Sequence, residues 1–366
     1  AWNLVEEYYV DREAVQPQRM TDGAILGMLD SLGDIGHTTY LTTKQYEQMT
    51  TNLHGDFTGI GARMTMRDRT PTIFSVIPHS PAAAKLKPGD VLLEVDGKPV
   101  HGLSVDEIVN MIRGKVDTEV HLRISRQGTQ QDVTIVRATF KVPAITGRLL
   151  PRLKPGDPLL AHVAIENFGD RADAQLRNVL GEVRAKGAQG LVVDLRGDGG
   201  GERDQAVSVT SEFLPKGKVI FQQKNARGGI KPVLVPTEGT ALTIPIVVLI
   251  DGGTASSAEI LAAAIKDNDR GRLVGQPTFG TGTVLGQFQL SDGSAVLLAI
   301  EEWLTPNGQS IWHKGIEPDI KVSLPKDALV LLPETEEGLT AEGLAHSSDA
   351  QLLAAIHALT EKMRKK

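Results

Sequence analysis

The strongest constraint on the fold is a pattern that occurs twice in the second half of the chain: an apolar strand, a glycine-rich turn and a helix. The first copy is "LVVDLRGDGGG", followed by the helical segment "RDQAVSVTSEFL". The second copy is "IPIVVLIDGGTASSAEILAAAIKDN". Strands that alternate with helices are typical of parallel sheets. The pattern therefore predicts an α/β domain with a mixed, largely parallel sheet.

Length and composition limit the rest of the interpretation. The chain has 366 residues, which predicts two or three domains. Its net charge of -6 argues against a nucleic-acid partner, which would require clustered Lys and Arg. The chain contains no cysteine, so it has neither a disulfide framework nor a cysteine metal site. No metal and no cofactor are expected.

Residues 57–140 have a different character, with short strands separated by tight turns. "LKPGD" and "VDGKPV" are the turns, and a helix is expected over 104–113. The whole block resembles a PDZ domain. Its "GIGA" segment, Gly59, Ile60, Gly61 and Ala62, occupies the place of that family's carboxylate-binding loop. The N–H groups of this loop could bind a terminal carboxylate while a peptide adds as a strand beside 61–66. Taken alone, the segment would favour a plain glycine turn; the turns and the helix that follow in order favour the PDZ interpretation.

The remaining boundaries follow from composition and periodicity. Residues 1–56 are expected to be a helical N-terminal segment, because "MTDGAILGMLDSLG" places apolar residues at helical spacing. Residues 141–324 form the α/β domain with a β-hairpin near its end. Residues 325–366 form a helical tail, with Ser348 as a candidate cap of the last helix.

The two glycine-rich turns carry the candidate chemistry. Asp194–Gly201 lacks the G-x-G-x-x-G spacing of a dinucleotide loop and is not a P-loop. Its backbone N–H groups could instead bind a developing oxyanion. In the second turn, Ser256 and Ser257 stand at the start of an apolar helix. A serine there is either a helix cap or a nucleophile exposed at a strand-to-helix turn.

The order of these pieces resembles the carboxyl-terminal processing proteases, also called tail-specific proteases. The N-terminal "AWNLVEEYYVD…GMLDSLG" is similar to that family's "VWNLIxxxYVD…GMLxSL". The PDZ domain, "DLRGDGGG", "GGTASSAEI", "TFGTGTV" and "LTPNGQSIWHKGIEPDI" then follow in the family's order. The resemblance covers nearly the whole chain and implies a crotonase-like protease core with an inserted PDZ domain.

The resemblance also implies a serine peptidase with a Ser–Lys dyad. Its nucleophile falls on Ser256, and its oxyanion donors fall on amides of the Gly199–Gly201 loop, Gly200 among them, and on the amide of Ser257. The family's lysine lies in "FGKG", where this chain has Thr281. The supporting glutamine falls on Leu285. A threonine hydroxyl is a poor base, and loss of a positioned base typically costs roughly 10²- to 10⁴-fold in rate.

Other residues could in principle replace the base. His162, His313 and Lys314 lie near the predicted sheet, and Lys266 is ten residues along the helix from Ser256, roughly 15 Å away at helical rise. Structural roles are expected for all four. Glu259, one turn beyond Ser256, is expected to be a helix N-terminal charge that the helix dipole stabilises.

Two hypotheses follow. The first is a serine endopeptidase that recognises protein C-termini through its PDZ domain and cleaves near them. The second is a catalytically inactive homologue that binds C-termini as an adaptor or regulatory subunit. Both expect partners with free apolar C-termini, and both allow self-association through the helical ends. The resemblance implies export to a periplasm, thylakoid lumen or cell exterior.

Overall fold

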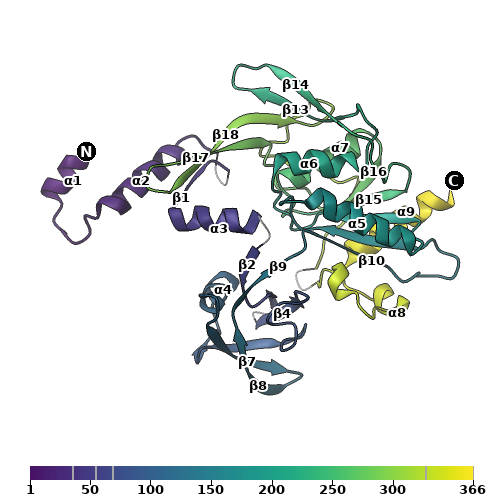
Figure 1. Cartoon of the computed structure of the whole chain (residues 1–366), viewed down its shortest axis with the longest axis horizontal. Helices are drawn as coiled ribbons and strands as arrows, with labels where there is room; N and C mark the ends of the chain where they lie inside the picture. Colours follow the sequence, from purple (N-terminus) through teal and green to yellow (C-terminus); the bar gives the residue numbers. More distant parts are fainter. Residues whose placement is uncertain (35–36, 54–55, 68–69, 326–327, 366) are drawn as a thin grey trace.

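A central six-stranded sheet organises the core of the chain. In the computed structural model, which describes all residues except 35–36, 54–55, 68–69, 326–327 and 366, the strand order is β10-β11-β12-β15-β16-β19 (Figure 1). Five of these strands run parallel, and β10 is an antiparallel edge. The largely parallel sheet predicted from the repeated pattern is confirmed. The strands are β10 (Ile145–Leu149), β11 (Leu160–Ile165), β12 (Gly190–Asp194), β15 (Ile246–Ile250), β16 (Gly271–Gly275) and β19 (Ile320–Lys321).

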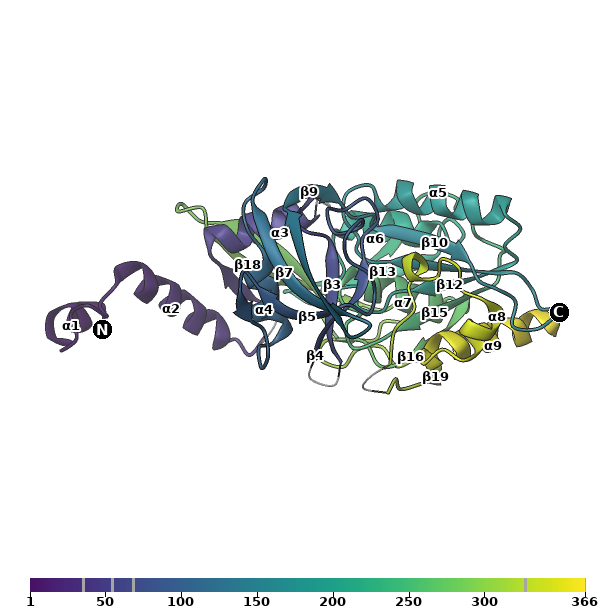
Figure 2. The same cartoon turned by 90° about the horizontal axis from the view of Figure 1, so that it is seen from below.

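Helices cover both faces of this sheet, as buried parallel strands require. Leu191 and Val193 of β12 face a cluster that contains α5, α6 and α7, whereas Val192 faces a cluster that contains α8 and α9. Figure 2 shows α5 and α9 on opposite sides of the strands. The helices are α5 (Ala172–Ala185), α6 (Arg203–Ser211), α7 (Ser257–Asp267), α8 (Ala341–Ala345) and α9 (Ala350–Arg364).

A second, antiparallel sheet lies beside the core and receives a strand from the N-terminal segment. Strand β18 pairs with β1, β13 and β17, and β14 pairs with β13. The pairing of β1 brings residues near position 40 against residues near position 296. These strands are β1 (Thr39–Leu41), β13 (Val219–Asn225), β14 (Ile230–Leu234), β17 (Thr283–Gln289) and β18 (Ala295–Leu304). The strand at 39–41 was not expected in a segment that reads as helical.

The PDZ domain is a separate β-sheet unit with its own hydrophobic core. Its sheet has the order β3-β4-β5-β7-β8, and β6 pairs with β5. A two-stranded ribbon, β2 (Asp56–Gly59) with β9 (Ala138–Lys141), flanks the domain where the chain enters and leaves it. The remaining elements are β3 (Ala62–Arg67), β4 (Thr70–Val76), β5 (Val91–Val95), β6 (Lys98–Pro99), α4 (Val105–Ile112), β7 (Glu119–Arg126) and β8 (Thr129–Val136).

The N-terminal helices extend away from the body of the molecule, whereas the C-terminal helix packs on it. Helices α1 (Trp2–Tyr8) and α2 (Pro17–Asp30) extend away from the body as an arm, and α3 (Thr43–Leu53) follows β1 (Figure 1). Helix α9, in contrast, packs on the central sheet through buried Leu352, Ile356 and Leu359. Its N-cap is Asp349, whose side chain accepts from Leu352 N–H, and not the expected Ser348.

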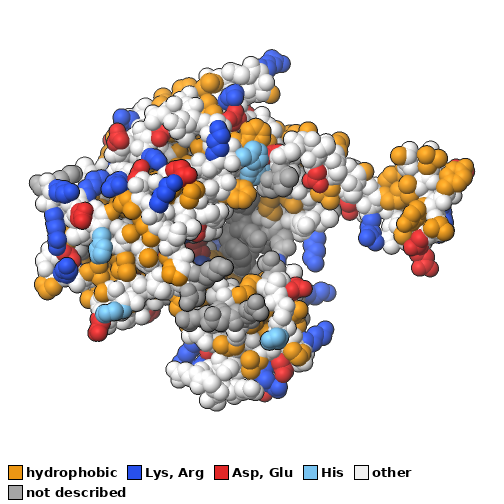
Figure 3. All heavy atoms as spheres, turned by 180° about the vertical axis from the view of Figure 1, so that it is seen from behind, with side chains coloured by type: hydrophobic (Ala, Val, Ile, Leu, Met, Phe, Trp, Pro, Cys, Tyr) orange, Lys and Arg blue, Asp and Glu red, His pale blue; other side chains and the backbone are white. Residues whose placement is uncertain are grey.

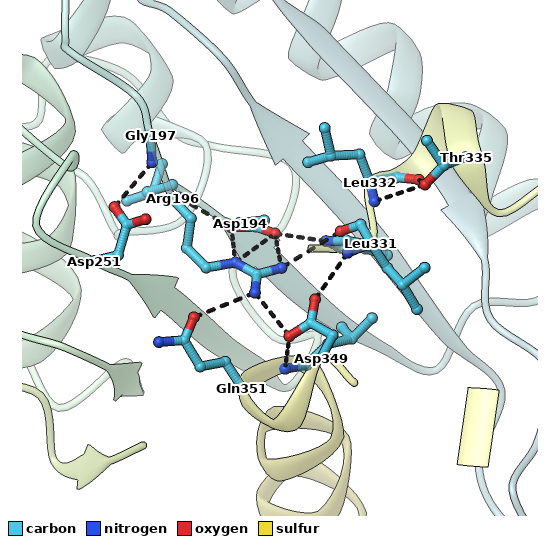
Figure 4. Close-up of polar contacts among 12 residues, drawn as sticks. Asp194, Arg196, Gly197, Asp251, Leu331, Leu332, Thr335, Asp349 and Gln351 are labelled. Atoms are coloured by element: carbon cyan, nitrogen blue, oxygen red, sulfur yellow. Dashed lines mark hydrogen bonds and ion pairs between the residues drawn. The ribbon is translucent and has the colours of Figure 1, made fainter. Parts of the chain in front are cut away.

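A buried ionic network fastens this C-terminal region to the sheet (Figure 4). The Arg196 guanidinium donates to Asp194 and to Asp349 Oδ1, the latter over 2.9 Å, and all three side chains are almost fully buried. His162 extends the network, because its ring nitrogens lie 3.0 Å from Asp194 and 2.6 Å from Glu336. Glu336 follows the short helix η1 (Pro333–Thr335), so the network joins β11, β12 and the C-terminal segment.

His162 is charged in this network. Burial by itself would lower its pKa, but the carboxylates of Glu336 and Asp194 outweigh that effect and raise the pKa of His162 to about 9. For Asp194, burial is likewise outweighed by Arg196 and His162, which hold its pKa well below the usual value. An imidazolium enclosed by two carboxylates cannot accept a proton at neutral pH. His162 therefore has the structural role expected for it.

This network predicts a loss of stability in mild alkali. Because the pKa of His162 is higher in the folded chain than the ordinary value of about 6.5, its contribution is complete below pH 6.5 and is lost as pH rises to about 9. The free energy of unfolding should fall by about 3 kcal/mol over this range. Urea unfolding from pH 6 to 9.5, followed by circular dichroism, measures the slope. His162→Gln should abolish it, and the exposed His357→Gln should keep it. Equal slopes in all three proteins would contradict the assignment.

Candidate active site

The two glycine-rich turns meet because their strands are neighbours. β12 and β15 are adjacent and parallel, so the turns that follow them leave the same edge of the sheet. Ala255 N–H donates to Asp198 O over 2.9 Å, which joins the turns directly. A Cβ at Gly200 would lie 2.7 Å from the Cβ of Ser256, so only glycine allows this approach. The loop and serine of the sequence prediction are thus in contact.

Ser256 has a strained backbone. Its φ of 53° and ψ of -119° place a non-glycine residue at positive φ immediately before helix α7. Such a conformation costs of order 1–3 kcal/mol and persists only where the surrounding structure enforces it. A serine on a sharp, strained strand-to-helix turn is the arrangement of nucleophiles in α/β-hydrolases. Ser256 is half-buried and lines a cavity of about 450 Å³.

Glu259 holds the serine turn to the loop that contains Thr281. Its carboxylate is fully buried and accepts from Ser256 N–H, Thr281 N–H, Gly280 N–H and the Thr278 hydroxyl, over 2.5–2.9 Å. These four donors occupy both carboxylate oxygens, so Glu259 is a scaffold and not a base. Glu259 lies in the first turn of α7, as expected. Its hydrogen-bond donors come from the start of its own helix and also from a loop some twenty residues further along the chain.

Thr281 lies where the family resemblance expects the base. Its Oγ1 accepts from the backbone N–H of Ser256 over 3.1 Å, so it contacts the nucleophile's main chain. The flanking glycines have positive φ, and a Cβ on Gly280 or Gly282 would collide with residues 312–315. The glycines thus let the loop lie against that segment. Leu285, at the position of the family's glutamine, lines the same cavity.

The oxyanion donors are only partly as expected. Gly200 N–H donates to Asp198 Oδ1 over 2.8 Å, so its predicted role requires that this bond open. Within the part of the chain that the structure describes, the N–H groups of Gly199, Gly201 and Ser257 donate no hydrogen bond. The hydroxyl of Ser257 donates to Gly201 O and fixes the loop against the helix. Burial raises the pKa of the Asp198 carboxyl, which accepts from the loop, well above its usual value.

The other candidate bases are either bonded to other residues or exposed at the surface. Lys266 Nζ donates to Glu317 O and pairs with Asp319. Lys314 is exposed, and so is His313, whose ring stacks on His37 and Trp312. Sequence reasoning did not single out His37, although it lines the same cavity as Ser256. No local signal marks it, because its place depends on the pairing of β1 with β18.

The PDZ domain contains an apolar groove of about 170 Å³. It lies between β3 and α4 and includes the expected Gly59, Ile60, Gly61 and Ala62. Ile77 N–H donates to Gly61 O, so Ala62 opposes Val76 as a non-hydrogen-bonded pair and its own N–H points away from β4. Among the described residues, the N–H groups of Ile60 and Gly61 also donate no hydrogen bond. Arg63 of β3 pairs with Glu166 of the core and lies 3.6 Å from Glu334.

The Glu259 scaffold yields a stability prediction. Glu259→Gln replaces one acceptor oxygen by an NH₂ group that faces N–H donors. Because hydrogen bonds to charged groups contribute roughly 1.5–3 kcal/mol each, we expect a loss of roughly 3 kcal/mol in the free energy of unfolding. Urea unfolding at pH 7 measures it. Glu202→Gln, an exposed glutamate beside the start of α6, is the matched control and should change little. Equal stability of the two variants would contradict the scaffold role.

Comparison with known proteins identifies the family. Residues 160–322 match the model of peptidase family S41, and residues 58–136 match that of the PDZ domain. Carboxy-terminal processing protease CtpA of Bacillus subtilis is 36% identical over 324 residues, which are 88% of this chain and 67% of that protein. CtpB of the same organism is 32% identical over 326 residues, 89% of this chain and again 67% of that protein.

The solved structure of a photosystem II D1 C-terminal processing protease is similar to this chain. It is 26% identical, with a TM-score of 0.55, and the match covers 91% of this chain and 96% of that one. The chain spans about two thirds of the length of the two Bacillus relatives. With these matches and its inserted PDZ domain, the chain belongs to peptidase family S41, among the carboxy-terminal processing proteases.

Proposed function

We propose that the chain is a serine endopeptidase that binds protein C-termini in its PDZ groove and cleaves near them with Ser256. The observation that carries this proposal is the strained backbone of Ser256 against Gly200. A serine that served only as a helix cap would need no positive φ, because caps ordinarily adopt extended backbone. The free amides of Ser257, Gly199 and Gly201 surround the same cavity and provide donors for an oxyanion.

The PDZ groove supports the choice of substrate. Its walls are largely apolar, with Met64, Leu86 and Val109 among them, and its loop presents free N–H groups. An extended peptide can add beside β3, place an apolar last side chain in the groove and direct its carboxylate to the loop. Protein or peptide substrates with free apolar C-termini are the partners that fit this chemistry.

A second function is favoured by Thr281 alone. With a threonine at the position of the family's lysine, the chain would be an inactive homologue that binds C-termini as an adaptor or regulatory subunit. Thr281 is buried and accepts from the main-chain N–H of Ser256, so it stabilises the turn without activating the hydroxyl. The first proposal therefore requires another base.

The N-terminal arm ends in an exposed apolar surface. Helix α1 and the residues after it expose Leu4, Val5, Tyr8, Tyr9 and Val10, which form an apolar surface at the tip of the arm (Figure 3). We infer that this arm contacts a second copy of the chain, whereas the apolar face of α9 is already packed against its own sheet.

The family resemblance supports export to a periplasm, thylakoid lumen or cell exterior. None of the helices in the described ranges has the length and apolarity of a membrane span.

Cleavage of an unfolded protein with an apolar C-terminus tests the two functions. We expect Ser256→Ala to lower the rate by about 10⁴-fold or more, because the nucleophile is lost. In a chain without a working base, Thr281→Lys, which places a lysine at the position of the family's base, should raise the rate by roughly 10²-fold. The exposed Ser323→Ala is the control and should match the wild type. No cleavage by the wild type, with intact C-terminus binding, would establish the inactive adaptor instead.

Peptide binding tests the groove separately. Measured by fluorescence anisotropy on full-length Ser256→Ala protein, a peptide with a free apolar C-terminus should bind at least tenfold more tightly than its amidated form. The reason is that hydrogen bonds to a charged acceptor contribute roughly 1.5–3 kcal/mol. Val109→Asp, in the groove wall, should abolish binding of the free-acid peptide, and exposed Val136→Asp on β8 should not. Equal affinity for both peptides would remove the proposed recognition.

A further inference from the structure

His37 is the feature of the cavity that the family resemblance leaves unexplained. It lies just before β1, only 5% of its surface is exposed, and it lines the cavity that contains Ser256, Thr281 and the glycine loop. Its ring packs edge-on against Phe279, with centroids 5.3 Å apart, and stacks on His313. Phe279 N–H in turn donates to Thr254 O, in the serine turn. The imidazole is thus fixed against the loop that packs on Ser256.

Asp34 orients this imidazole. Its Oδ1 lies 3.0 Å from Nδ1 of His37, and its Oδ2 accepts from both the N–H and the hydroxyl of Thr38. Trp312 Nε1 also donates to Oδ1. Burial alone would raise the pKa of Asp34, but these hydrogen bonds outweigh it and lower the pKa. A carboxylate held in the charged form selects the tautomer of His37 in which Nδ1 carries the proton.

That tautomer leaves Nε2 with a free lone pair. Nε2 is buried and, among the described residues, has no hydrogen-bond partner. A buried nitrogen without a partner is costly, unless a ligand or substrate supplies the missing contact. The other titratable side chains that line the cavity are Glu202 and Arg203. Arg203 pairs with Asp204 and is always protonated, whereas an imidazole is by nature suited to proton transfer near neutral pH.

We propose that His37, oriented by Asp34, is the general base for Ser256 and takes the place of the lysine that Thr281 replaces. This inference rests on the proposed endopeptidase function. As Oγ of Ser256 attacks the scissile carbonyl carbon, its proton passes to Nε2 and the carbonyl electron pair moves to the oxygen. The C–N bond then breaks, and the departing amine takes the proton from Nε2. Water hydrolyses the acyl-enzyme by the same route, with its proton passing through Nε2 as Oγ leaves.

The geometry sets one requirement. No hydrogen bond joins Nε2 of His37 to Oγ of Ser256 in this structure, although both residues line one cavity. A base must come within about 3.2 Å of the hydroxyl, and such contacts often form only when substrate is bound. Thr281 fits this arrangement, because a short side chain beside the Ser256 main chain leaves room for the imidazole.

Exchange of one base for the other provides the test. Four full-length proteins are compared for cleavage of the unfolded substrate and for labelling by a fluorophosphonate: wild type, His37→Gln, Thr281→Lys and the double variant. We expect His37→Gln to lower both rates by roughly 10²- to 10⁴-fold. Thr281→Lys should restore at least tenfold in the His37→Gln background. If His37 is the base, Thr281→Lys should raise the rates much more in the His37→Gln background than in the wild type, whereas a merely structural histidine predicts an equal gain in both.

The controls separate the possible failures. His357→Gln removes an exposed imidazole on α9 and should change either rate less than threefold. Unchanged thermal melting and peptide binding show that His37→Gln is folded. Ser256-dependent cleavage that persists in His37→Gln would overturn the role of His37 and leave the proposed function intact. A wild type that neither cleaves nor reacts with the fluorophosphonate would remove both proposals. Loss of activity in His37→Gln without recovery on adding Thr281→Lys would also overturn the assignment as base.

Discussion

The buried carboxylate of Glu259 is the interaction on which the active-site architecture depends. It accepts from the main chain of Ser256 on one side and from Thr278, Gly280 and Thr281 on the other. Hydrogen bonds to a charged group contribute roughly 1.5–3 kcal/mol each, which is sufficient to offset the cost of about 1–3 kcal/mol for the positive φ of Ser256. The carboxylate thereby fixes both the strained serine and the loop that faces it.

The same arrangement explains how a threonine can stand at the position of the family's lysine without collapse of the loop. Thr281 is held by its backbone N–H, which donates to Glu259, so the course of the loop does not depend on the side chain at this position. Its hydroxyl accepts from Ser256 N–H and needs no charge to do so. Replacement of the base therefore changes the chemistry of the cavity more than its shape. This is the physical setting in which a histidine from another element can assume the role.

Polar networks, more than apolar packing alone, connect the distant parts of the chain. Arg196 and His162 join the parallel sheet to the C-terminal segment, and Arg63 joins the PDZ domain to Glu166 and Glu334. Each network contains groups of opposite charge in a largely buried place, where an unpaired charge would be costly. The C-terminal helix is thus part of the protease core, and the PDZ domain is held against the core near the active-site loops.

Much of the fold could be predicted from the sequence, because its determinants are local. Alternating strands and helices specified the parallel sheet, tight turns specified the PDZ domain, and the motifs around Ser256 placed Thr281 opposite the nucleophile. Contacts that depend on long-range pairing could not be predicted. The strand at 39–41 reads as part of a helical segment, and Asp349 caps the last helix because Arg196 holds it there.

The candidate site also combines features set by local sequence with features set by long-range contacts. The sequence by itself indicated the family and predicted Ser256 at the position of its nucleophile and Thr281 at the position of its lysine, since these depend on the identity of residues at short, regular spacings. Only the tertiary structure decided that Glu259 is a scaffold, that Gly200 is bonded to Asp198 and that His37 faces the cavity of Ser256. His37 and Ser256 are more than two hundred positions apart. The antiparallel pairing of β1 with β18 brings them to one cavity, and no local pattern encodes that pairing.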